Sequence, residues 1–72
     1  MEDIKIGGIY KHYKGNLYKV LMIGTNSETL ELMIVYQAMY GDNKIWIRPA
    51  SMWNEIVIVD SKSVSRFTLM KE

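Results

Sequence analysis

The chain contains no cysteine among its 72 residues, and His12 is its only histidine. Disulfides, thiol nucleophiles and thiolate metal sites are therefore excluded, and a reducing compartment suits the composition. A histidine-based metal site or a Ser-His-Asp triad would have to use His12 alone, and the favoured interpretation of His12 is a structural residue on a half-buried strand. We expect a protein that is not an enzyme and that carries neither a metal nor a cofactor.

The chain also lacks a large excess of either charge and has no long apolar run. Nine Lys and Arg residues oppose eight Asp and Glu residues, so the formal net charge is +1, which disfavours a dominant phosphate-backbone binder but leaves a small basic patch open. The longest apolar runs, such as Leu32 to Tyr36 and Ile56 to Val59, are far shorter than the roughly 20 residues needed to span a bilayer. Glu2 and Asp3 stand where a secretory signal would carry basic charge. We expect a cytoplasmic protein without a membrane segment.

The length is that of one domain, residues 1–72. Hydrophobic residues make up 49% of the chain, which is the composition of a globular domain and not of a disordered segment. Only about 60% of the unfolded chain's surface can be buried at this size, so we expect a thin core.

Two alternating, aromatic-rich runs flank Lys14-Gly15-Asn16 and predict a hairpin, because Gly15 and Asn16 accept the positive φ that tight turns need. Alternation places Tyr10 and His12 on one face of the first strand. In the second strand, residues 17–23, it sets Tyr18, Val20 and Met22 opposite Leu17, Lys19, Leu21 and Ile23.

The next segment has two interpretations. Thr25 and Glu28 match a helix capping box, which would be followed by a helical stripe of Leu30, Met33, Ile34 and Ala38. Residues 30–40, however, are rich in poor helix formers and are bounded by Gly41-Asp42, which is equally typical of a long strand. The residues alone favour the strand but do not decide between the two.

A second hairpin is predicted around the turn Tyr40-Gly41-Asp42-Asn43, and its second strand ends at Pro49. In this strand Ile45 and Ile47 make the better core face, so we expect them to be buried, with Trp46 and Arg48 pointing outwards. Tyr36 and Tyr40 would then share the outward face with Trp46.

Residues 51–55 predict one helical turn, and residues 56–59 and 64–69 predict two closing strands around the turn 60–63. Five or six short strands in so short a chain predict an all-β fold. We expect a small, SH3-like, strongly bent antiparallel sheet or partly open barrel with one short helical turn.

Several sequence blocks together resemble a family of small bacterial domains, domain of unknown function 1653. The blocks are Gly8-x-Tyr10-x-His12-Tyr13-Lys14-Gly15-Asn16-x-Tyr18-x-Val20, Ser27-Glu28-Thr29, Val35-Tyr36-x-x-x-Tyr40-Gly41-Asp42, Trp46-x-Arg48-Pro49 and Arg66-Phe67. The resemblance implies a mostly β fold, and so a strand at residues 30–40, but no settled activity. This chain departs from the family pattern at Ser61-Lys62-Ser63, where a glycine turn is expected, and at Trp53, where phenylalanine is usual.

Three functional hypotheses follow. The leading one is a non-enzymatic binding module that holds a peptide or partner protein in an aromatic groove of Tyr10, Tyr13, Tyr36, Tyr40 and Trp46, with Arg48 and Glu28 as polar anchors. The second is a nucleotide or single-stranded nucleic acid binder, in which phosphates meet Lys11, Lys14, Lys19, Arg48 and Arg66. The third is a homo-oligomer whose aromatic cluster is its subunit interface.

The full set of candidate ligand-binding residues is Tyr10, His12, Tyr13, Glu28, Tyr36, Tyr40, Trp46, Arg48 and Arg66. A purely structural interpretation competes with it. Trp46 would then close the rim of a small barrel, and Arg48 would pair with Glu28 or Asp42.

Overall fold

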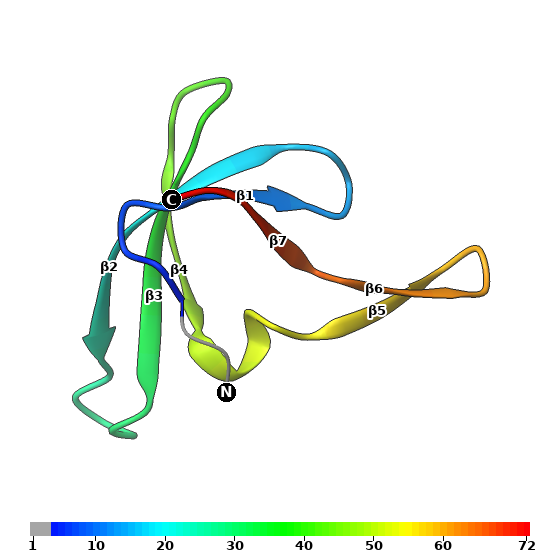
Figure 1. Ribbon diagram of the computed structural model, residues 1–72. Coiled ribbons are helices and arrows are strands. Elements are labelled where there is room, and N and C mark those ends of the chain that lie inside the picture. The colour runs from blue at the N-terminus through cyan, green and yellow to red at the C-terminus, as the bar shows by residue number, and fades with distance from the viewer. Residues whose placement is uncertain (1–3) are drawn as a thin grey trace.

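The computed structural model describes residues 4–72, so Glu2 and Asp3 lie outside the described residues. A five-stranded antiparallel sheet has the order β4-β3-β2-β1-β7, and a separate two-stranded hairpin consists of β5 and β6 (Figure 1). The strands are β1 Ile9–His12, β2 Leu17–Thr25, β3 Leu32–Ala38, β4 Ile45–Pro49, β5 Ile56–Val59, β6 Lys62–Ser65 and β7 Phe67–Lys71. The predicted all-β architecture is confirmed, as a strongly bent sheet that does not close into a barrel.

The first predicted hairpin is present between β1 and β2. Lys11 lies opposite Leu17, and the N–H of His12 donates to the carbonyl of Asn16 over 2.8 Å. Gly15 has a φ of 107°, a conformation that side chains with a Cβ rarely adopt. The turn therefore forms where the sequence supplies the one residue that takes this conformation without strain.

The ambiguous segment is a strand, β3, preceded by a turn that Asn26 organises. The side-chain oxygen of Asn26 accepts a hydrogen bond from the N–H of Glu28 over 2.8 Å, and the backbone carbonyl of Asn26 accepts one from the N–H of Leu30 over 2.8 Å. Leu30 then takes a φ of 64°, which ends any helical course. The polar residues that resemble a capping box thus form a loop between β2 and β3.

A β-bulge in β2 changes which of its side chains face the core. The register shifts between Val20 and Met22, so that Ile23 lies opposite the buried Ile34. Met22 consequently points to the convex side and is 56% exposed. The expectation that Met22 shares a face with Val20 is wrong, because the extra residue inverts the alternation beyond the bulge.

The core lies on the concave side of the sheet and centres on Trp53, whose side chain is fully buried. Its ring stacks on Phe67 with centroids 3.9 Å apart, and it meets the rings of Tyr10 and Tyr36 edge-on at 5.4 and 4.9 Å. Trp53 follows the 3-10 turn η1, Ala50–Met52, which overlaps the helical turn predicted at residues 51–55 but begins one residue earlier and is shorter. No helix within residues 4–72 is long and apolar enough to cross a membrane.

The parity predicted for β4 is wrong. Ile45 and Ile47 are 58% and 65% exposed, and Trp46 lies opposite Tyr36, which is buried. Trp46 does keep part of its ring in solvent, being 47% exposed, but it does so at the rim of the concave side. The reason is that β4 takes its parity from β3, whose buried residues Ile34 and Tyr36 face Trp53 and Phe67.

After the turn at Asp60-Ser61 the chain forms two strands, β6 and β7, where the sequence predicted a single strand over residues 64–69. β6 and β7 are separated at Arg66, whose N–H donates to the carbonyl of Glu55 over 2.8 Å and whose carbonyl accepts from Tyr13 over 2.9 Å. The β5–β6 hairpin projects from the body as an arm (Figure 1). Its two-residue turn, Asp60-Ser61, has φ values of 50° and 65°, so the tight turn forms without glycine.

Candidate binding surface on the concave side of the sheet

Trp46 and Arg48 on the edge strand β4 form the centre of the candidate site. Tyr36 lies opposite Trp46 on β3, and the Nε–H of Arg48 donates to the Tyr36 hydroxyl over 3.3 Å. The Arg48 guanidinium also lies 5.7 Å from the centroid of the Phe67 ring, within cation–π range. A hollow of about 210 Å³ opens here, lined by Tyr18, Tyr36, Trp46 and Arg48.

A second hollow lies on the other side of Trp46, towards the β3–β4 turn. Its volume is about 190 Å³, and it is lined by Ala38, Tyr40, Gly41, Asp42, Lys44 and Trp46. The Lys44 ammonium lies 5.9 Å from the Trp46 ring centroid. Because Trp46 lines both hollows, the two sites are adjacent, and each has a size suited to one side chain.

The phenols of Tyr18 and Tyr40 connect these hollows. Their hydroxyl oxygens are hydrogen-bonded at 2.7 Å. Burial, reinforced by the hydrogen bond to Tyr40, raises the pKa of Tyr18 to about 12. Tyr18 is therefore a neutral phenol at physiological pH, and it offers a ligand a fixed polar group without charge.

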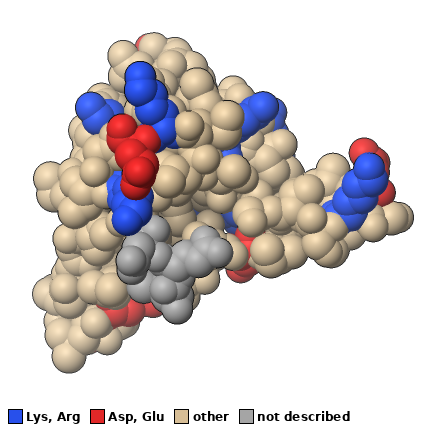
Figure 2. Space-filling model, in the orientation of Figure 1, with Lys and Arg blue, Asp and Glu red and all other residues tan. Residues whose placement is uncertain are grey.

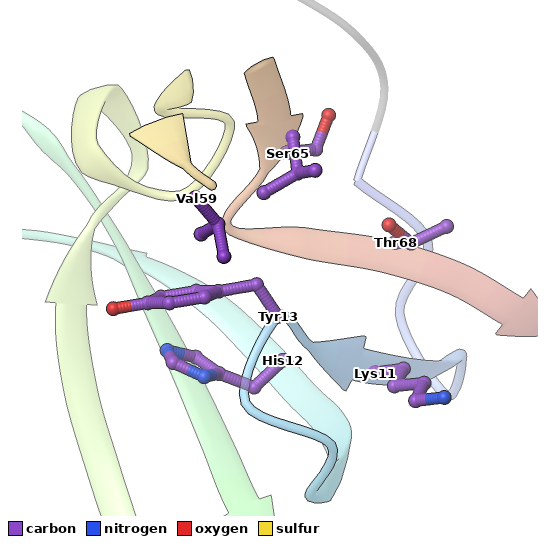
Figure 3. A pocket seen from close by; sticks show the side chains of 7 residues that line it. Lys11, His12, Tyr13, Val59, Ser65 and Thr68 are labelled. Atoms are coloured by element: carbon purple, nitrogen blue, oxygen red, sulfur yellow. The ribbon is translucent and has the colours of Figure 1, made fainter. Parts of the chain in front are cut away.

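A third hollow, of about 190 Å³, lies between β1 and the arm (Figure 3). Figure 3 shows the Tyr13 ring lying over the His12 ring, and their centroids are 4.5 Å apart. The Arg66 guanidinium is 6.0 Å from the Tyr13 ring centroid, and its Nε–H donates to Glu55 over 3.1 Å. The residues that line this hollow are Lys11, His12, Tyr13, Val59, Val64, Ser65 and Thr68.

The electrostatic environment of His12 is positive. Burial lowers the pKa of its imidazole, and the nearby charges of Arg66, Arg48 and Lys14 lower it further. Its Nδ1 accepts a hydrogen bond from the backbone N–H of Lys14 over 3.2 Å, which is the structural role expected for this residue. Basic and acidic side chains lie next to each other on the face seen in Figure 2, so that face carries no large area of one charge.

The structure brings only some of the sequence-predicted residues together. Tyr36, Trp46 and Arg48 share one hollow, and Tyr40 joins them through the second. Tyr36 nevertheless belongs to the core, with 5% of its surface exposed, so its expected outward orientation is wrong.

Tyr10 and Glu28 lie apart from this group. Tyr10 is 5% exposed, and its hydroxyl accepts from the backbone N–H of Lys5, so it is a core residue and not a wall of a groove. Glu28 lies in the β2–β3 turn. Within residues 4–72 Arg48 forms no ion pair, so the expected pairing of Arg48 with Glu28 or Asp42 does not occur.

Six residues of the site were not among the predicted ligand-binding residues: Tyr18, Ala38, Gly41, Asp42, Lys44 and Phe67. Tyr18 carries a signal in the sequence, because it lies directly opposite Tyr10 in the first hairpin and must share its face. Phe67 carries none, since it reaches the concave side only through the pairing of β7 with β1.

Comparisons with known proteins agree with this fold. A family model described as protein of unknown function (DUF1653) matches residues 8–69. A crystal structure of a DUF1653 protein from Bordetella bronchiseptica superposes with a TM-score of 0.86 at 32% sequence identity, covering 99% of this chain and 92% of that one. No curated protein matches the chain. On the family match over most of its length, this chain belongs to the DUF1653 family.

Proposed function

We propose that this protein is a non-enzymatic binding module that holds a segment of a partner protein against Trp46 on the concave side of its sheet. The observation that carries the proposal is the pair of Trp46 and Arg48. A half-exposed indole lies beside a guanidinium that has no carboxylate partner within residues 4–72. Tryptophan and arginine are the residues most enriched at the energetic centres of protein interfaces.

The sizes of the hollows support a protein segment as the ligand. The two hollows beside Trp46 have volumes of about 210 and 190 Å³, whereas small-molecule sites usually measure roughly 300–1,000 Å³. Two small adjacent hollows suit two neighbouring side chains of a peptide. Arg48 favours a carboxylate among them, because a guanidinium binds a carboxylate through two parallel hydrogen bonds.

His12 supports a function without catalysis. Its Nδ1 is occupied by the backbone N–H of Lys14, and the nearest charged groups that act on it are cations. General base catalysis by histidine commonly needs an acceptor that orients the ring from its other nitrogen. The cysteine-free composition and the Bordetella relative suit a bacterial cytoplasmic protein.

Selection from a displayed random peptide library on the purified protein tests the proposal. We expect enriched sequences that contain an acidic residue and an aromatic or aliphatic residue. Trp46→Ala and Arg48→Ala should each weaken their binding at least tenfold, whereas Ile58→Ala, on the exposed arm, should leave it unchanged. Peptides that bind equally well to both site variants would contradict the proposal.

A nucleotide or a short single-stranded nucleic acid is the second candidate ligand, because three cations, Lys14, Arg48 and Arg66, act on His12, whose ring lies close to that of Tyr13. Bases would stack on the rings and phosphates would meet the cations. Titration with a short oligothymidylate at two salt concentrations separates the two candidates. Nucleic acid binding should weaken steeply as salt rises, and peptide binding only slightly.

A further inference from the structure

The strand β4 is an edge of the main sheet, and one side of its backbone faces away from β3. The N–H of Ala38 donates to the carbonyl of Lys44 over 2.9 Å, which marks these opposite residues as a hydrogen-bonded pair. Such pairs alternate along an antiparallel ladder, so Trp46 and Arg48 also bond to β3. Ile45 and Ile47 must then direct their N–H and C=O groups towards the free edge.

Pro49 agrees with this assignment. It has the same parity as Ile45 and Ile47, so its nitrogen faces the free edge, where a missing N–H costs no bond to β3. Pro49 also sets the limit of the free edge, because a strand added there finds no donor at this position.

The convex side of the same edge is apolar. Ile45 and Ile47 are 58% and 65% exposed. Met22, Val35 and Ile47 lie in one row across three strands, and Met22 is itself 56% exposed. Charged side chains commonly protect edge strands from pairing, and none lies on this side of β4.

Two cations lie on the concave side of this edge, Lys44 just before β4 and Arg48 within it, on either side of Trp46. Asp42, in the preceding turn, lines the same hollow as Lys44. A second copy of β4 paired antiparallel about Trp46 would set each Lys44 opposite the other copy's Arg48. Like charges in that position destabilise a sheet. Charge complementarity instead selects a strand that presents carboxylates on this side.

We propose, on the basis of the binding function above, that β4 accepts an additional strand from an extended segment of a partner protein. The added strand bonds to the N–H and C=O groups of Ile45 and Ile47, which face away from β3 and pair with no other strand within residues 4–72. Its side chains alternate in chemistry. Apolar ones cover Ile45 and Ile47 on the convex side, and acidic ones meet Lys44 and Arg48 on the concave side.

A capped hexapeptide of alternating valine and glutamate is the probe, titrated into the ¹⁵N-labelled protein to several millimolar. The control peptides are a block arrangement of the same composition and an alternating valine–lysine peptide. We expect the probe alone to shift the amide resonances of Ile45 and Ile47 and to slow their hydrogen exchange at least tenfold. Shifts confined to other regions, or no shifts at millimolar concentration, would overturn the proposal.

Ile47→Pro is the decisive variant, because proline removes an N–H that points away from β3 and leaves the β3–β4 ladder intact. We expect it to weaken probe binding at least tenfold, whereas Ile47→Val keeps the N–H and should change binding less than threefold. A probe with its backbone nitrogens methylated on the bonding side tests the same hydrogen bonds on the wild-type protein. Undiminished binding of that methylated probe would overturn the proposal even if Ile47→Pro fails to fold.

The outcomes separate this inference from the general binding function. If the probe's binding depends on Trp46 and Arg48 but not on the N–H of Ile47, strand addition is wrong and the concave site stands. If Ile47→Pro abolishes probe binding but Trp46→Ala leaves it unchanged, strand addition is supported and the concave site is not. Protection of the Ile45 and Ile47 amides that rises with protein concentration in the absence of probe would show that the edge binds a second copy, and would overturn the choice of partner.

Discussion

Alanine replacement of Tyr36 and Trp46, one at a time, should separate the core from the rim of the concave surface. The two residues lie opposite each other on neighbouring strands, yet Tyr36 is 5% exposed and Trp46 is 47% exposed. The Tyr36 ring contacts the rings of Tyr18, Trp53 and Phe67, with centroids 5.4, 4.9 and 5.7 Å away. Truncating a buried aromatic residue of this kind costs about 3–5 kcal/mol.

That loss is large for so small a protein. At about 0.05–0.15 kcal/mol per residue, 72 residues give a free energy of unfolding of roughly 4–11 kcal/mol. Tyr36→Ala should therefore lower Tm by at least about 12 °C, at about 4–8 °C per kcal/mol. Tyr36→Phe keeps the ring and loses only the hydroxyl that accepts from Arg48, so it should cost about 1 kcal/mol.

Trp46→Ala should cost less, because about half of its ring stays in solvent. Half of the roughly 150–250 Å² that an aromatic side chain buries, at about 25 cal/mol per Å², sets an upper bound of about 2–3 kcal/mol. Alanine keeps part of that contact, and the unfolded chain also buries some, so we expect about 1 kcal/mol.

Urea unfolding followed by circular dichroism measures all three variants without depending on tryptophan fluorescence. The core-and-rim assignment is refuted if Trp46→Ala costs as much as Tyr36→Ala, or if Tyr36→Ala costs less than about 1.5 kcal/mol.

Three further predictions follow from the arm, the tryptophans and the histidine. Ser61 has a φ of 65°, so Ser61→Gly should raise the free energy of unfolding by about 1 kcal/mol in urea melts, whereas Ser63→Gly, within β6, should not raise it. In a Trp53→Phe variant iodide should readily quench the fluorescence of Trp46, whereas in a Trp46→Phe variant the fluorescence of Trp53 should be shielded from iodide. Equal quenching in the two variants would contradict their exposures of 47% and 0%. The pKa of His12 should lie below 6.5 in an NMR titration. Protonation of His12 then favours the unfolded chain, so the contribution of neutral His12 to the free energy of unfolding is complete above pH 6.5 and is lost as pH falls through the folded-state pKa. Identical pH profiles of stability for wild type and His12→Gln would contradict this.

Local sequence was a good guide where a structure depends on neighbouring residues. The first hairpin depends on Gly15 taking a positive φ between two alternating strands, and both features are visible in the sequence. The turn 40–43 is likewise local, and the N–H of Asn43 donates to the carbonyl of Tyr40 over 3.1 Å. The pattern also placed Trp46 beside Arg48, because residues two apart on a strand share a face.

Side-chain direction was harder to predict wherever it depends on distant elements. In β4 both faces carry large apolar side chains, so alternation alone identifies two faces without saying which one is covered. The more apolar face, Ile45 and Ile47, is the exposed one.

The sequence by itself determined the first two hairpin turns and a short helical turn near Trp53, since each depends on conformational preferences within a few residues. The residues favoured a strand over 30–40 without deciding it, and the family resemblance implied the all-β chain. Only the tertiary structure decided which face of the sheet is the core. Phe67 is brought to the concave side by the pairing of β7 with β1, and it stacks on Trp53 there. That contact buries Tyr36 and leaves Trp46 at the rim, because the curved sheet can enclose the middle of its concave face but not its edge strand.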